Sequence, residues 1–246
     1  MIQILSTKLI RQTEMHMKNK KNIVYITLVI IIASSVACFY LLDFYRPNKD
    51  NLYKIYTSED FPNALNIMNE EILESSLKNL NEQYQDLRDG EYVYLSWINV
   101  GILKKRMKDY PGAEKAWLNA IDHSPDQALS YGNLADLYLF NMKEYEKAEE
   151  YYLKVLEMSP MHHGYYVGLV SLYRYNMTEK ANLIEGIMID GAKINPSEAE
   201  NYYMYLANYF SEGPDNNGGN DKEKAKHYIQ EVLKINPELK DQLPDL

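Results

Sequence analysis

Cysteine is nearly missing from this 246-residue chain, and the usual catalytic motifs are missing altogether. The only cysteine, Cys38, lies in an apolar run, so the chain can form neither an intrachain disulfide nor a zinc site built on several cysteines. Phosphate-binding glycine loops, HExxH helices, GxSxG turns and paired CxxC motifs are absent. The sequence therefore predicts no enzyme activity, no cofactor and no metal site.

Basic residues are outnumbered by acidic ones outside the N-terminal part of the chain. The chain has 26 Lys and Arg against 35 Asp and Glu, a formal net charge of −9. Residues 1–42 hold five of the bases and one acid, a net of +4, which leaves −13 for the remainder. Because an acidic body repels phosphate backbones, we expect no nucleic acid among the partners.

Residues 23–42 form an uncharged, predominantly apolar run of 20 residues. A helix of this length covers about 30 Å, the thickness of a hydrocarbon core, so the run predicts a transmembrane signal-anchor helix. Lys18, Lys20 and Lys21 end a basic N-terminal segment at residues 1–22. Because cytoplasmic flanks carry the excess of Lys and Arg, we expect a cytoplasmic N-terminus and repeats on the far side of the membrane, outside a bacterial inner membrane.

Other interpretations of this run stay open. Residues 35–38 partly match a bacterial lipoprotein processing site, in which Cys38 would be lipidated. A buried core helix is a further alternative. Met17 could be the true start in place of Met1, and a eukaryotic protein of the mitochondrial surface could leave its repeats in the cytosol.

The stretch between the apolar run and the repeats divides into two parts. Residues 43–57 contain Pro47, Asn48 and several charges, which indicates a linker. Residues 58–90 carry apolar residues at three- and four-residue spacing, which predicts two helices near 61–74 and 76–88. We interpret these helices as a divergent helical hairpin or as a cap on the repeats. Residues 239–246 are expected to form a C-terminal tail.

Two units with a period of about 34 residues follow each other between residues 94 and 160. The first has Trp97 and Gly101 before a turn at 109–111, then Ala113, Trp117 and a closing Pro125. A fixed period of this length is the signature of stacked helical hairpins, and weaker copies continue to residue 238. The corresponding residues of the second unit are Tyr131, Ala135, Ala148, Tyr152 and Pro160.

This order of aromatic, small, alanine and proline residues resembles the tetratricopeptide repeat family. The resemblance implies an all-α fold, with a helical-hairpin solenoid of about four hairpins over residues 91–238. The turn of the fourth unit carries an insertion at residues 213–221. Seventeen of the 23 tyrosines lie between Tyr92 and Tyr228, mostly at the packing positions of the family, so we interpret them as core residues.

In this family the first helix of each hairpin lines a concave groove that accepts a peptide or a helix of a partner protein. Asn99 and Asn133 stand where a side-chain amide would grip the backbone of such a ligand, since an amide both donates and accepts. Residues 104–106 form the densest basic patch of the acidic body. The partner-groove candidates implied by the resemblance are Ile98, Asn99, Ile102, Lys105, Arg106, Asn133, Asp136, Phe140, Arg174 and Tyr175.

Two functions fit these observations. The first is a membrane-anchored scaffold that binds another protein in its groove and is attached to the membrane through residues 23–42. The second is a structural assembly factor or lipoprotein that self-associates or packs laterally in an envelope complex. The sequence leaves the identity of the partner and the oligomeric state open.

Overall fold

The computed structural model of the chain describes residues 52–213 and 217–245, which belong to a unit that begins at Leu52. Every regular element of these residues is a helix, so the predicted all-α class is confirmed for this part of the chain. The predicted membrane segment at residues 23–42 lies outside the described residues. Within them, no helix is both long and apolar enough to cross a bilayer.

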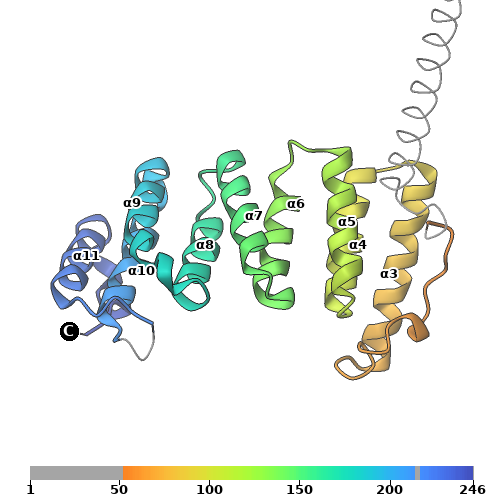
Figure 1. The fold of residues 1–246 in the computed structure, drawn as a ribbon, viewed down its shortest axis with the longest axis horizontal. Coiled ribbons are helices and arrows are strands. Elements are labelled where there is room, and N and C mark those ends of the chain that lie inside the picture. The colour runs from red at the N-terminus through yellow and green to blue at the C-terminus, as the bar shows by residue number, and fades with distance from the viewer. Residues whose placement is uncertain (1–51, 214–216, 246) are drawn as a thin grey trace, which may run out of the picture. The chain divides into compact units, whose positions relative to one another are not determined.

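The described unit is a succession of helices in which contacts run mainly between neighbours in the chain (Figure 1). The main helices are α3 (Glu70–Asp89), α4 (Val93–Arg106), α5 (Tyr110–His123), α6 (Ala128–Asp136), α7 (Tyr145–Met158), α8 (His163–Tyr175), α9 (Ile184–Ile194), α10 (Ala199–Ser211) and α11 (Lys222–Ile235). Short helical turns lie between or beside them: η1 (Ser58–Asp60), η2 (Leu137–Met142), η3 (Thr178–Leu183), η4 (Pro196–Glu198) and η6 (Pro237–Gln242). Beyond α3 the helices pair as hairpins: α4 with α5, α6 with α7, α8 with α9, and α10 with α11.

Side-chain caps mark the start of two of the second helices, α5 and α11. Asp109 caps α5 by accepting a hydrogen bond from the Gly112 N–H at 3.0 Å. Pro111 stands in the first turn of α5, where its missing N–H leaves no helical bond unmade. Asp221 caps α11 in the same way through the Lys224 N–H at 3.0 Å. The last residue of the insertion at 213–221 is therefore the residue that caps α11.

Paired helices approach closely where a small residue faces an aromatic ring. An added Cβ at Gly101 in α4 would lie 2.2 Å from the indole nitrogen of Trp117 in α5. That indole N–H donates to the Ile98 carbonyl at 3.2 Å, which joins the two helices directly. Trp97 and Trp117 are both buried, as their spacing predicts. The first hairpin is thus packed at a distance that only glycine allows at this position.

A recurring set of three side chains links a second helix to the hairpin that follows it. In each set a glutamate on a second helix accepts a hydrogen bond from a tyrosine hydroxyl and faces a lysine of the next hairpin. In the set around Glu149, Tyr173 and Lys180 each lie 2.5 Å from its carboxylate. The sets found in the described residues are Glu114 with Tyr138 and Lys147, Glu149 with Tyr173 and Lys180, and Glu185 with Tyr228 and Lys224.

The set around Glu185 takes its hydroxyl from a different helix. Tyr138 in η2 and Tyr173 in α8 hold equivalent positions in the second and third hairpins. The equivalent residue of the fourth hairpin is Phe210 in α10, which has no hydroxyl. The hydroxyl of Tyr228 in α11 donates to Glu185 instead, at 2.7 Å. The chain therefore keeps the same contact to the carboxylate with a donor from another position.

The residues ahead of the hairpins differ from the two helices expected near 61–74 and 76–88. A single helix, α3, starts after Asn69, whose side chain accepts from the Ile72 N–H at 2.8 Å. Residues 62–67 form turns instead. The expected break near residue 75 does not occur: α3 runs without interruption from Glu70 to Asp89, and the Ser76 hydroxyl bonds to the Ile72 carbonyl within it at 2.8 Å. The role of this segment as a cap stays a prediction.

Residues 52–64 lie along α3, and we name them the N-terminal arm. Asn81 binds both the N–H and the carbonyl of Tyr56, at 2.8 and 3.0 Å. The Tyr56 ring stacks on Tyr84 with 4.9 Å between the ring centroids. Closer to the start of the arm, the Arg88 guanidinium donates to the Leu52 carbonyl. The chain is therefore attached to α3 from Leu52 onward.

Candidate partner-binding surface

The first helices of three hairpins carry the predicted groove residues, and three of those residues hold the same place in successive hairpins. Arg106, Phe140 and Tyr175 are spaced 34 and 35 residues apart, at or near the ends of their first helices. All three are exposed, Phe140 to 62% and Tyr175 to 52%. We name them the exposed row. An arginine and two aromatic rings in such a row can bind an apolar segment that also carries a carboxylate.

Phe140 lies in η2, a π-helical stretch of six residues that the sequence analysis did not predict. Wider π turns inside helices are frequent at functional sites. The stretch ends at Met142 and is followed by Lys143, which has a left-handed backbone (φ 58°). Because the three residues before Phe140 are buried, its ring is the apolar group that this stretch presents to solvent.

Tyr175 is held in place by a buried arginine. Arg174 is only 6% exposed, pairs with the Glu212 carboxylate at 2.5 Å and lies over the Tyr175 ring at 4.9 Å. Burial alone would lower the pKa of Arg174, but the Glu212 carboxylate together with Tyr175 and Tyr205 outweighs it, so the pKa is raised and the group stays charged. A fixed cation against the ring restricts Tyr175 before any partner arrives, which reduces the entropy lost on binding.

Several predicted groove residues are engaged within the chain. Ile98 is 3% exposed and belongs to the core, so a partner does not reach it in this structure. The Asn99 amide donates to Gln83 at 3.0 Å. Asp136 accepts a hydrogen bond from the Tyr152 hydroxyl at 2.6 Å. A partner could use Asn99 or Asp136 only by sharing or replacing these bonds.

The remaining predicted residues lie on the same first helices as the exposed row, as do two that the sequence analysis missed. Ile102 is 48% exposed and Lys105 is half-buried. The Asn133 amide nitrogen is buried and has no hydrogen-bond partner among the residues that the structure describes. Leu95 and Leu129 were missed, although both are about half exposed in the first turns of α4 and α6. Their spacing of 34 residues could have indicated them.

The basic patch at residues 104–106 is smaller than the sequence suggests. Lys104 is 8% exposed, forms an ion pair with Asp109 at 2.8 Å and lies over the Tyr56 ring at 4.8 Å. It therefore stabilises the contact between the N-terminal arm and the first hairpin. Lys105 and Arg106 are left as the bases of this patch that a partner can reach.

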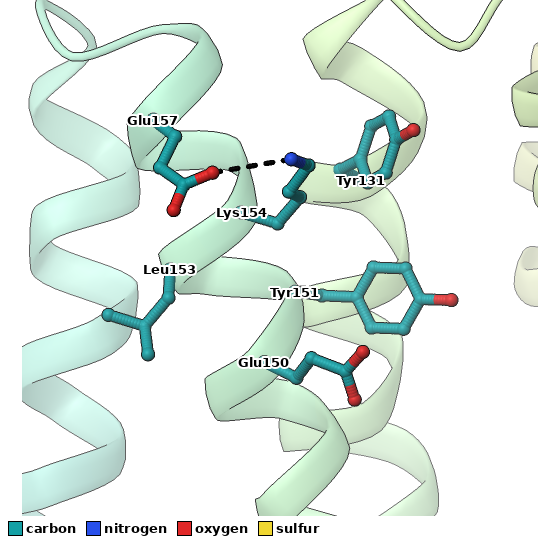
Figure 2. Close-up of a pocket in the computed structure, with 6 residues that line it drawn as sticks. All are labelled: Tyr131, Glu150, Tyr151, Leu153, Lys154 and Glu157. Atoms are coloured by element: carbon teal, nitrogen blue, oxygen red, sulfur yellow. Dashed lines mark hydrogen bonds and ion pairs between the residues drawn. The ribbon is translucent and has the colours of Figure 1, made fainter.

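A separate pocket of about 460 Å³ lies on the second hairpin and was not predicted. Figure 2 shows the rings of Tyr131 and Tyr151 extending to the same side, and their centroids are 6.2 Å apart. Lys154 pairs with Glu157 at 3.2 Å at one edge of the pocket. It is lined by Tyr131, Glu150, Tyr151, Leu153, Lys154 and Glu157.

The described part of the chain does not bring together three His, Cys, Asp or Glu residues that could hold a metal ion. The candidate contact surfaces described above are the exposed row and the pocket on the second hairpin. The exposed row is the one that coincides with predicted groove residues.

Comparison with known proteins supports a repeat identity for the second hairpin. A family model described as the tetratricopeptide repeat matches residues 128–162, which contain α6, η2 and α7. The chain thus contains a tetratricopeptide repeat, in agreement with the resemblance drawn from the sequence. A search of curated proteins found no match to the chain.

Proposed function

We propose that this chain is a membrane-anchored tetratricopeptide protein that binds another protein through the first-helix surface around the exposed row. Tetratricopeptide repeats generally mediate protein–protein interaction and are typically non-enzymatic scaffolds. The proposal assigns residues 23–42 as the anchor, the N-terminus to the cytoplasm and the repeats to the far side of the membrane. The uncharged 20-residue run and its Lys-rich N-terminal flank support this part.

The binding proposal rests on the exposure of one arginine and two aromatic side chains in the exposed row. Aromatic and arginine side chains supply most of the binding energy at protein interfaces, where they are buried in the centre of the contact. Burying a phenylalanine side chain stabilises a complex by about 1.5–3 kcal/mol. Phe140 and Tyr175 offer two such rings from adjacent hairpins, and Tyr175 is already restrained by Arg174.

The charges around the row indicate what the partner carries. Lys105 and Arg106 stand at the first-hairpin end of the row, whereas the chain beyond residue 42 is acidic overall. A matching partner segment therefore has apolar side chains for Phe140 and Tyr175 and an acidic side chain for Arg106. A partly extended peptide or an amphipathic helix meets both requirements.

Site-specific photocrosslinking in the native membrane tests this proposal. A photoreactive residue at Phe140 or Tyr175 of the full chain is expected to crosslink to the same partner protein, which mass spectrometry identifies. The matched control is Leu183, which is 45% exposed in η3 and lies outside the first helices. Equal crosslinking from Leu183 to the same protein, or none from the exposed row, would contradict the assignment.

The alternative function, lateral packing in an envelope complex, is favoured by the pocket on α7. Tyr151 and Leu153 lie on a second helix, away from the first-helix residues of the exposed row, and Leu153 is 47% exposed. Light scattering of the full chain in detergent separates the two functions. A concentration-dependent oligomer that Leu153→Asp abolishes would favour lateral packing, and a monomer at high concentration would exclude self-association.

A further inference from the structure

The most exposed large hydrophobic side chains of the described residues gather at the N-terminal end of the unit. Ile55 is 75% exposed, Tyr53 74% and Tyr92 72%, and the next in rank is Phe140 at 62%. Single exposed apolar residues are common on soluble surfaces and need no explanation. Here the three highest values fall in the N-terminal arm and the turn between α3 and α4, outside the exposed row.

The arm contacts place these residues near the point where the described chain begins. Arg88, in the last turn of α3, donates to the Leu52 carbonyl, so the next residue, Tyr53, lies beside that turn. Tyr92 follows Arg88 by four residues and precedes α4. Tyr92 has a left-handed backbone (φ 46°), which a bulky residue rarely adopts. Both tyrosines therefore belong to the same end of α3.

The length of chain between the predicted anchor and Leu52 limits how far this end can be from a bilayer. Ten residue steps separate residue 42, the last of the predicted span, from Leu52. A fully extended chain covers about 3.3–3.6 Å per residue, so the separation is at most about 35 Å. Because Arg88 and Asn81 fix the arm to α3, the arm does not lengthen this connection.

Charge at this end indicates the kind of lipid surface that it fits. Residues 53–55 and 88–92 contain two bases, Lys54 and Arg88, and two acids, Asp89 and Glu91. Lys54 pairs with Asp60, and Asp89 accepts from Gln85 at 2.8 Å. A surface without a basic excess has no electrostatic attraction to anionic lipid. Tyrosine is nevertheless enriched at membrane interfaces, where its ring lies among the headgroups and its hydroxyl stays hydrated.

We infer that Tyr53, Ile55 and Tyr92 form a membrane-contact patch that enters the headgroup region of a zwitterionic lipid bilayer. This inference rests on the proposed membrane anchor and adds a second contact between the chain and the bilayer. With the anchor as one attachment and the patch as another, the first hairpin is held against the membrane in a restricted set of orientations.

The test uses the full chain in nanodiscs of phosphatidylcholine with brominated acyl chains, which quench nearby tryptophan. Tyr53→Trp and Tyr92→Trp each add a tryptophan to the buried Trp97 and Trp117, whose emission in the parent chain is subtracted. The control is Ile235→Trp, at a residue 47% exposed at the end of α11. Emission of the added tryptophan is expected to be reduced by the brominated chains at positions 53 and 92 and to be unchanged at 235.

The outcomes separate this inference from the anchor proposal. Release of the full chain from membranes by alkaline washing would overturn the anchor and the patch together. Retention of the chain in the membrane, with quenching at positions 53 and 92 no greater than at 235, would overturn the patch alone. Quenching that appears only when phosphatidylglycerol is added would overturn the assignment to a zwitterionic surface.

Discussion

Gly101 and Gly191 show how little space separates the helices at the aromatic contacts of this protein. A Cβ at Gly191 would lie 2.3 Å from the ring of Tyr202, much as one at Gly101 would meet Trp117 at 2.2 Å. Both contacts are to buried rings that cannot move without disturbing their neighbours. Gly186, in α9, is different, because a Cβ there would meet no atom within 4 Å.

We predict that Gly101→Ala destabilises the described unit whereas Gly186→Ala does not. Overpacking a well-packed core costs about 1–3 kcal/mol, because Trp117 must shift and its bond to Ile98 weakens. At Gly186 the same change adds helix propensity and is expected to stabilise by about 0.5–1 kcal/mol. Thermal unfolding of both variants, followed by circular dichroism, checks this contrast. Equal midpoints for the two variants would contradict it.

At the scale of elements, the glutamate, tyrosine and lysine sets link one hairpin to the next. The side chains of Glu149 and Glu185 are partly buried, and each carboxylate accepts hydrogen bonds from a tyrosine hydroxyl and a lysine ammonium group. Such charge-assisted bonds are stronger than neutral ones, and exposed ion pairs on helix surfaces contribute much less. The sets should therefore affect stability more than the surface pairs such as Lys193 with Asp190.

Tyr173→Phe is predicted to lower the free energy of unfolding by about 1–2 kcal/mol, because Glu149 loses a hydroxyl donor. Tyr228→Phe should have a similar effect through Glu185. Tyr92→Phe is the control, since its ring is 72% exposed. Unfolding by urea gives the three values, and an equal small change in all of them would show that the sets do not stabilise the interfaces.

Acid should weaken the same interfaces. Burial raises the pKa of Glu149 and Glu185, but the lysine and tyrosine donors lower it by more, so both groups have a pKa below their ordinary value of 4.5. Their stabilisation is complete above that value and is lost as the pH falls through the lower pKa of the folded state. We expect the unfolding midpoint of Glu149→Gln to depend less on pH below 4.5 than that of the wild type. Parallel pH profiles would contradict this.

The periodic part of the fold could be predicted from the sequence, and the contacts between repeats could not. Spacing of aromatic and small residues identified the second hairpin and the burial of Trp97 and Trp117. Glu114 with Tyr138 and Glu149 with Tyr173 share a spacing of 24 residues, but Glu185 and Tyr228 are 43 residues apart, so a single spacing does not indicate every contact between repeats.

The surroundings of the candidate site residues could be predicted only in part, because they depend on neighbouring elements as well as on the repeat position. A repeat position indicates which way a side chain faces along its own helix, but not what a neighbouring element places over it. Ile98 and Arg174 were assigned to the groove and are buried by such neighbours. The π-helical stretch around Phe140 also has no simple periodic signal, because one wider turn interrupts the helical period.

For the molecule as a whole, contacts between consecutive helices mean that stability is distributed along the described unit. In such arrays each element stabilises mainly its neighbours, so a local change propagates only a short distance. Among the described elements, the more extensive contacts join elements that are close together in the chain.

Gly191→Ala is predicted to reduce hydrogen-exchange protection in α9, α10 and α11 while leaving α4 and α5 protected. The added Cβ meets Tyr202 in α10, whereas the first hairpin lies several elements away. Hydrogen exchange followed by mass spectrometry resolves these helices. A uniform loss of protection from α3 to α11 would show that the unit unfolds as one cooperative body.

The central claim, that the exposed row binds the partner, is tested most directly by an affinity measurement with the partner that crosslinking identifies. Phe140→Ala combined with Tyr175→Ala in the full chain is predicted to weaken binding at least tenfold, a loss of about 1.4 kcal/mol or more, with helicity unchanged. Leu183→Ala should bind as the wild type does. An unchanged affinity for the doubly substituted chain would contradict the account.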